Sequence, residues 1–144
     1  MEEQNYAKHA KFVPLFHMVL FGLIFLTLCG SVYNVVRTVG RGAGRLDAVL
    51  IAMVSFAMVL LFFFCRTFPL KAQDRAIRAE ENLRHFALTG RLLDKRLSVK
   101  QIVGLRFASD GEFVALAQRA ADESLTPDAI KRAVKNWKAD YDRL

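Results

Sequence analysis

Two long apolar runs without a charged residue follow one another in the N-terminal half of the chain. The first extends from Leu15 to Val36 and the second from Ala48 to Cys65. At ~1.5 Å per residue they reach roughly 33 and 27 Å as helices, close to the ~30 Å hydrocarbon thickness of a bilayer. A short loop with three glycines joins them. The pattern therefore predicts an antiparallel transmembrane hairpin.

Small residues recur on one side of the second run, at Ala48, Ala52 and Ser55. They predict the face on which the two helices meet, because small side chains let helix backbones approach closely in lipid. The corresponding small residues of the first run are Gly22, Cys29, Gly30 and Ser31.

Charged residues are concentrated after residue 70, where 11 of the 14 acidic residues lie. This segregation predicts a lipid-solvated part, residues 1–70, and a water-solvated helical tail, residues 71–144. The tail is near the lower size limit for a self-supporting core, which excludes a large catalytic domain.

The first part of the tail predicts a long helix, because nothing interrupts it between Pro69 and Gly90. Apolar residues recur on it at alternating spacings of four and three. Such a seam is suited to packing on another helix, and we predict that it is an interaction surface. Its members are Ala72, Ala76, Ala79, Leu83 and Phe86. Ion pairs four residues apart, Glu80 with Arg84 and Glu81 with His85, are expected to support the helix.

Three shorter helices are predicted beyond Gly90, and the fold class is therefore all-α. Their starts are marked by Ser98, by Ser109 with Glu112, and by Thr126 with Pro127. The third helix is expected to continue to Tyr141, with one apolar face formed by Ile130, Ala133, Val134, Trp137 and Tyr141. Trp137 and Tyr141 are further candidates for partner binding, and packing of Trp137 in the core is the alternative.

Basic residues flank the predicted hairpin on both sides. Lys8 and Lys11 precede it, four further basic residues follow it between Arg66 and Arg78, and the connecting loop carries three arginines. The excess outside the loop predicts that both termini are cytoplasmic, in a bacterial inner membrane. Residues 66–100 carry a net charge of +5, which favours contact with anionic lipid, whereas the neutral remainder and the absence of a readout motif exclude nucleic acid as a partner.

No motif for catalysis or for cofactor binding is apparent in the sequence. His9, His17 and His85 lie in separate segments, without a paired cysteine or an HExxH pattern, so we expect no metal site. There is no GxSxG motif, and the glycine-rich loop lacks the GK[ST] ending of a phosphate loop. We therefore expect no cofactor and no enzymatic activity.

Four stretches together resemble a family of short bacterial two-pass membrane proteins that is catalogued only as a domain of unknown function. They are QNYAKHAKFVPLFH (Gln4–His17), KAQDRAIRAEENLRHFALTGRLLD (Lys71–Asp94), LRFASDGEFVALAQRA and IKRAVKNWKADYDRL. Members of that family are sometimes labelled transporter permeases. Two helices alone do not enclose a substrate path, and no intramembrane charge marks one here. The resemblance implies no activity, ligand or catalytic residue.

The sequence thus favours a non-enzymatic accessory or scaffolding subunit of a bacterial inner-membrane assembly. Its partners would be the lipid bilayer and other membrane protein subunits or a second copy of itself, because apolar stripes on the tail need a covering surface. One alternative is a channel or transporter component, with a lumen formed by Thr27, Ser31, Asn34 and Ser55. Another is a small membrane-bound enzyme with a site at the inner interface, formed by His17, His85, Arg66 and Glu81.

Overall fold

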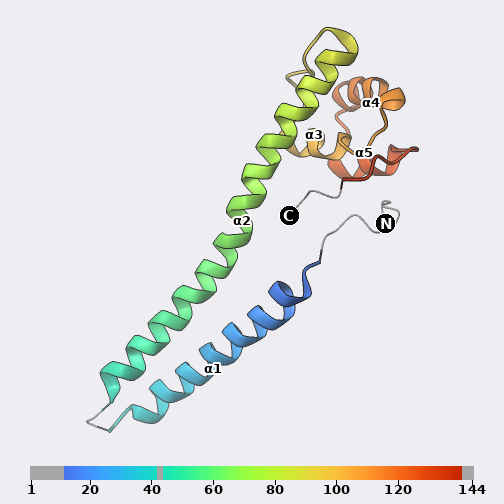
Figure 1. The fold of residues 1–144 in the computed structure, drawn as a ribbon. Coiled ribbons are helices and arrows are strands. Elements are labelled where there is room, and N and C mark those ends of the chain that lie inside the picture. The colour runs from blue at the N-terminus through green and yellow to red at the C-terminus, as the bar shows by residue number, and fades with distance from the viewer. Residues whose placement is uncertain (1–11, 42–43, 141–144) are drawn as a thin grey trace. The chain divides into compact units, whose positions relative to one another are not determined.

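The computed structural model describes residues 12–41 and 44–140, and within these ranges it consists of helices, loops and one isolated β-bridge (Figure 1). The all-α class predicted from the sequence is confirmed. In order, the elements are the π-helical segment η2 (Leu15–Leu20), α1 (Phe21–Thr38), α2 (Arg45–Thr89), α3 (Val99–Leu105), α4 (Asp110–Asp122) and α5 (Pro127–Ala133). The described chain divides into two compact units. One is Phe12–Phe68, and the other contains the chain from Pro69 onward.

Inside the first unit, the facing sides of α1 and α2 carry its buried residues. Ala48 is fully buried and Ser55 almost so, as the small-residue pattern on the second run predicted. On α1 the buried residues are Ile24 and Ser31. Phe16 stacks on Phe62 with 4.5 Å between ring centroids. Cys29 and Gly30 are exposed, so the prediction that they line this face was wrong.

The two buried serines of this unit satisfy their hydroxyl groups within their own helices. The Ser31 hydroxyl donates to the Leu28 carbonyl at 2.7 Å, and the Ser55 hydroxyl donates to the Ile51 carbonyl at 2.8 Å. Neither hydroxyl needs a partner from the opposite helix, so the interface is held by packing.

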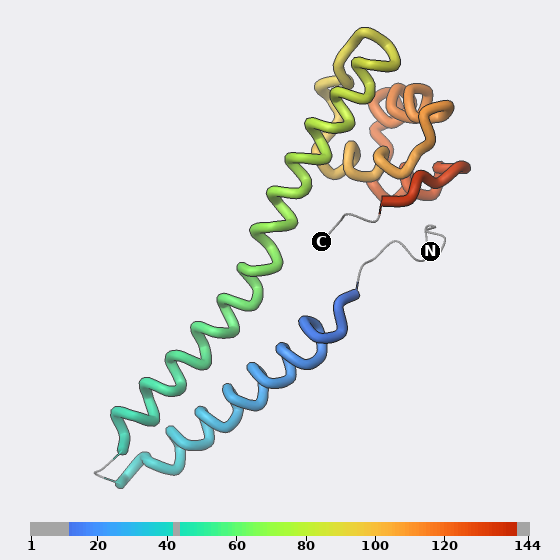
Figure 2. The backbone as a smooth tube through the Cα atoms, in the orientation of Figure 1, coloured from blue at the N-terminus to red at the C-terminus, as the bar shows by residue number. Residues whose placement is uncertain are grey.

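Helix α2 continues past the second apolar run, includes Pro69 and ends at Thr89. Pro69 has no amide hydrogen, so the Cys65 carbonyl loses its usual intrahelical donor at this point. Gly90 follows with φ +73°, and its amide donates to the Phe86 carbonyl at 2.7 Å. This left-handed residue confirms the predicted end of the helix. Beyond it the chain reverses direction, as Figure 2 shows.

In the second unit, α3, α4 and α5 pack around one apolar core. Phe107, Phe113, Leu105 and Ile130 are its largest fully buried side chains. Helices α3 and α5 approach closely at Gly104, where an added Cβ would lie 3.2 Å from the Pro127 carbonyl oxygen and 3.5 Å from the Ile130 side chain. A Cβ at this crossing would therefore need the Pro127 backbone to move by a few tenths of an ångström.

All three predicted helix starts in the tail are confirmed. Before α3, the Ser98 amide donates to the Gln101 side chain at 2.7 Å, and the Gln101 amide donates back to the Ser98 hydroxyl at 3.3 Å. Ser109 and Glu112 form the corresponding capping box of α4. Thr126 accepts the Ala129 amide at 3.1 Å before α5, and Pro127 occupies the first helical position.

The predicted third helix is wrong in its second half. Helix α5 ends at Ala133, and Val134 is extended. The following residues run beside the α3–α4 connection, where Trp137 forms a β-bridge with Ala108 and the Lys138 amide donates to the Phe107 carbonyl at 2.8 Å. These long-range hydrogen bonds replace the helical ones that the apolar spacing suggested. Tyr141 lies outside the described residues.

Candidate functional site

The C-terminal part of α2 has one face directed at the tail core. Ile77 and Glu81 are buried there, and Arg84 is largely buried. These residues recur at spacings of four and three, so they share one side of the helix. The Arg84 side chain reaches α4 and the connection before it, and this contact attaches the end of α2 to α4. Figure 1 shows the end of α2 beside the short helices.

The seam predicted from the sequence lies on the other side of α2, and we call it the α2 stripe. Its five members, Ala72, Ala76, Ala79, Leu83 and Phe86, are all exposed. Leu83 is 68% and Phe86 51% exposed, so two large apolar side chains have no cover from the described part of the chain. Paired apolar side chains on an uncovered helix face are typical of a binding surface.

Arg84 connects α2 to the start of α4. Its guanidinium donates from Nε to Asp110 Oδ1 at 2.7 Å, from Nη1 to Glu81 Oε2 at 3.0 Å and from Nη2 to the Ala108 carbonyl at 2.7 Å. It also lies over the Phe113 ring, 4.3 Å from its centroid. The expected pairing of Arg84 with Glu80 was wrong, because Arg84 turns toward the tail core and takes Glu81 instead.

His85 is likewise held by contacts other than the predicted one. Its Nδ1 lies 2.7 Å from the Arg91 carbonyl oxygen, and its ring meets the Phe113 ring edge-on at 6.0 Å. It does not pair with Glu81, whose carboxylate is bound by Arg84. Arg84 and His85 therefore help to position the start of α4 and the turn after α2.

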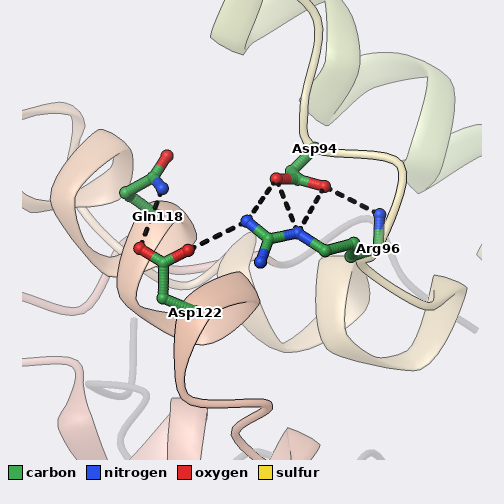
Figure 3. A network of polar contacts seen from close by, with 4 residues as sticks. All are labelled: Asp94, Arg96, Gln118 and Asp122. Carbon is green, nitrogen blue, oxygen red and sulfur yellow. Dashed lines mark hydrogen bonds and ion pairs between the residues drawn. The ribbon is translucent and has the colours of Figure 1, made fainter.

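Arg96 bridges the loop after α2 and the end of α4 (Figure 3). Its guanidinium contacts Asp94 at 2.7 Å and Asp122 at 2.9 Å. The hydrogen bonds from the Arg96 side chain and backbone lower the pKa of Asp94, and those from Gln118 and Arg96 lower the pKa of Asp122. The two carboxylates in turn raise the pKa of Arg96. All three charges are solvent-accessible, so the network orients the loop more than it stabilises the fold.

Glu112 holds the extended segment that follows α5. Its carboxylate accepts the amides of Asn136 at 2.9 Å and Lys135 at 3.0 Å, in addition to the Ser109 amide at 3.4 Å. Burial acts to raise the pKa of Glu112, but the amide donors of Asn136, Lys135 and Ser109 outweigh it and the pKa is lowered. Only the capping box was apparent from the sequence, because the other partners are more than twenty residues away.

Trp137, the second predicted interaction candidate, is partly covered by the tail core. Its ring lies 4.7 Å from that of Phe107, and its backbone is fixed by the bridge to Ala108. This placement agrees with core packing, the alternative to partner binding for Trp137. Its companion Tyr141 belongs to the residues that the structure does not describe.

Within residues 12–41 and 44–140, no three His, Cys, Asp or Glu side chains gather as a metal site would require. His17 Nδ1 lies 2.9 Å from the Val13 carbonyl oxygen, within its own segment. Both cysteines are free. The residues named for a possible interface enzyme, His17, Arg66, Glu81 and His85, are divided between the two compact units.

A comparison with known protein families finds one matching model, described as a family of unknown function (DUF6526), over residues 1–144. The chain belongs to this family. The resemblance inferred from the sequence, to a domain of unknown function, is thereby confirmed. Neither the curated proteins nor the solved structures contain a match to the chain.

This DUF6526 protein also has a half-open cleft of about 360 Å³ in its second unit. Charged side chains of both signs line it, among them Glu80, Glu81, Arg106, Lys138 and Asp140. Arg106 lies 3.3 Å from Asp140, and Glu81 is bound to Arg84, so these two ion pairs serve to hold the fold. Among the described residues that line it there is no histidine, cysteine or serine to act as a nucleophile or as an imidazole base. In this member of the family, the α2 stripe is therefore the better candidate for function.

Proposed function

We propose that this protein is a non-enzymatic accessory or scaffolding subunit of a bacterial inner-membrane assembly, with both termini in the cytoplasm. The observation that carries the proposal is the α2 stripe. Its small and large apolar residues are exposed on the side of α2 that faces away from the tail core. A surface of this kind serves binding and supplies no chemistry.

Two helices are long and apolar enough to cross a membrane, Leu15–Thr38 and the first part of Arg45–Thr89. Only 11% of the most apolar window of each is buried inside the structure, whereas the core helix of a soluble protein is mostly buried. Lipid is the solvent that covers such a surface without another protein chain, which supports membrane insertion.

The hydroxyl groups of these helices give little support to the alternative of a channel or transporter component. Thr27 donates to the Leu23 carbonyl at 2.7 Å, and both buried serines donate within their own helices. Side chains bonded in this way present few free polar groups to a lumen.

The decisive experiment is purification of the full chain from bacterial membranes in mild detergent or native nanodiscs, followed by mass measurement and identification of co-purifying proteins. We expect the chain in the membrane fraction, as part of a larger assembly. A lone monomer, or a chain found only in the soluble fraction, would contradict the proposal.

The α2 stripe itself is tested by Ala76→Glu with Ala79→Glu. Both changes place a charge on an apolar contact surface beyond the second apolar run, so assembly should be lost while membrane insertion persists. Arg78→Glu is the matched control, because it adds a carboxylate to an exposed position of the same helix, away from the stripe. Loss of assembly in Arg78→Glu alone would contradict the assignment of the α2 stripe as the contact surface.

A further inference from the structure

We propose that the α2 stripe pairs with the α2 stripe of a second copy of this chain, as a short parallel two-stranded coiled coil. The proposal rests on the proposed function, because the shared membrane sets the direction of the two chains. It names the partner of the stripe and the register of the contact.

The stripe has the spacing of a coiled-coil seam. Ala72, Ala79 and Phe86 take the d positions of a heptad, and Ala76 and Leu83 take the a positions. In the same register Ile77 and Arg84 fall at b and Glu81 at f. The residues that face the tail core thus occupy outer positions, so the core does not obstruct pairing through a and d.

The membrane sets the relative direction of two such helices. Copies inserted with the same orientation carry their α2 helices out of the bilayer on the same side, and the stripe begins seven residues after Cys65. A twofold axis along the membrane normal then brings each stripe residue opposite the same residue of the second copy. The resulting pair is parallel and in register.

The charges beside the seam are complementary in this arrangement. Arg75 takes the g position and Glu80 the next e position. In a parallel pair, g of one helix faces the following e of the other, so Arg75 of each copy meets Glu80 of its neighbour. In an antiparallel pair g faces g and e faces e, so Arg75 and Glu80 of the two copies would not meet. Both side chains are exposed, and among the described residues neither forms an ion pair.

The side-chain sizes along the stripe also suit self-pairing. The three alanines allow the helices to approach closely near the membrane, and Leu83 and Phe86 supply large apolar surface further along. Anchoring in one membrane holds the stripes at a high effective concentration, which compensates for the shortness of the seam.

Disulfide cross-linking in native membranes tests the register. In the full chain with Cys29→Ala and Cys65→Ala, single cysteines are introduced by Ala72→Cys, Ala79→Cys or Phe86→Cys, and a mild oxidant is added. We expect a covalent dimer from each of the three. The control Arg78→Cys, exposed but off the seam, should yield roughly tenfold less, because cross-linking requires Cα atoms within ~7 Å.

Dimer from Ala79→Cys alone would indicate crossing or antiparallel helices and would overturn the proposal. So would an adduct with a different protein, or the absence of dimer in a chain that fractionates with the membrane. A chain outside the membrane fraction contradicts the proposed function instead, and cross-linking at all three positions would still support pairing of the stripes.

A charge exchange tests the Arg75–Glu80 contact between copies. Arg75→Glu and Glu80→Arg each place like charges opposite one another, twice per dimer, and should lower the dimer formation constant by roughly tenfold. The double variant restores opposite charges and should recover dimer formation. Failure of the double variant to recover it would overturn the assigned register.

Discussion

Arg84 Nη2 lies 2.6 Å from Asp110 Oδ1, which joins the end of α2 to the first residue of α4 across twenty-six positions of the chain. The same guanidinium binds Glu81, which is almost fully buried. One side chain thus neutralises a buried carboxylate and fixes α4 against α2. It also determines which side of α2 the tail core covers, and hence which side is left exposed.

Arg84→Met should therefore destabilise the second unit more than its contact with Asp110 alone suggests. The change leaves the Glu81 carboxylate buried without its cation, which typically costs about 3–5 kcal/mol. The effect is measured by thermal unfolding of the full chain in detergent. Limited proteolysis of the chain beyond Gly90 reports the unfolding. The exposed Arg91→Met is the control and should change stability by less than about 0.5 kcal/mol. Equal effects of the two variants would contradict the role given to Arg84.

Glu112 should make the tail sensitive to acid. Its pKa is lowered in the folded protein by the Asn136, Lys135 and Ser109 amides, so its contribution is present at pH values above its unfolded pKa. That contribution is lost as the pH falls through the lowered folded pKa. Glu112→Gln removes this dependence and should cost about 1–2 kcal/mol at neutral pH, from weakened hydrogen bonds.

The measurement is the protection of the Lys135 and Asn136 amides by hydrogen exchange, between pH 7 and pH 3. Protection in the parent chain should fall as the pH is lowered, and in Glu112→Gln it should be low throughout. A parent chain whose protection does not change over this range would show that the carboxylate does not hold the segment.

Gly90→Ala should destabilise the turn after α2, because φ +73° is a conformation that residues with a Cβ rarely adopt. The expected loss is about 1 kcal/mol, read as a lower unfolding temperature of the full chain. Gly111→Ala is the matched control. Gly111 lies within α4 with open space around a Cβ, so alanine there should be neutral or stabilising by up to ~1 kcal/mol.

Substitution of the two described histidines distinguishes the proposed accessory subunit from the alternative of an interface enzyme. His17→Ala and His85→Ala should leave the mass and composition of the purified assembly unchanged, and the associated cellular function should persist. His85 packs on Phe113, so its variant is compared with His85→Gln, which keeps a hydrogen-bonding side chain but has no imidazole. Loss of function in His85→Gln, with normal assembly, would favour the enzyme.

Local signals in the sequence were sufficient for the elements and for several of their faces. The spacing of Ala48, Ala52 and Ser55 predicted a packing face of α2, and Gly90 predicted the end of that helix. Caps and apolar periodicity act over one or two turns, so neighbouring residues are enough to read them. For the same reason the α2 stripe is apparent as a pattern in the amino-acid sequence alone.

The tertiary structure decided what long-range contacts control. The apolar spacing at Val134 and Trp137 favoured a longer helix, but the amides of Lys135 and Asn136 bond to Glu112 on α4 instead. Helix α2 has an apolar stripe on one side and Ile77, Glu81 and Arg84 on another, and only the packing of the tail shows which side is covered. Hydrogen bonds and charges from distant parts of the chain make that choice, and they leave no periodic signal in the sequence.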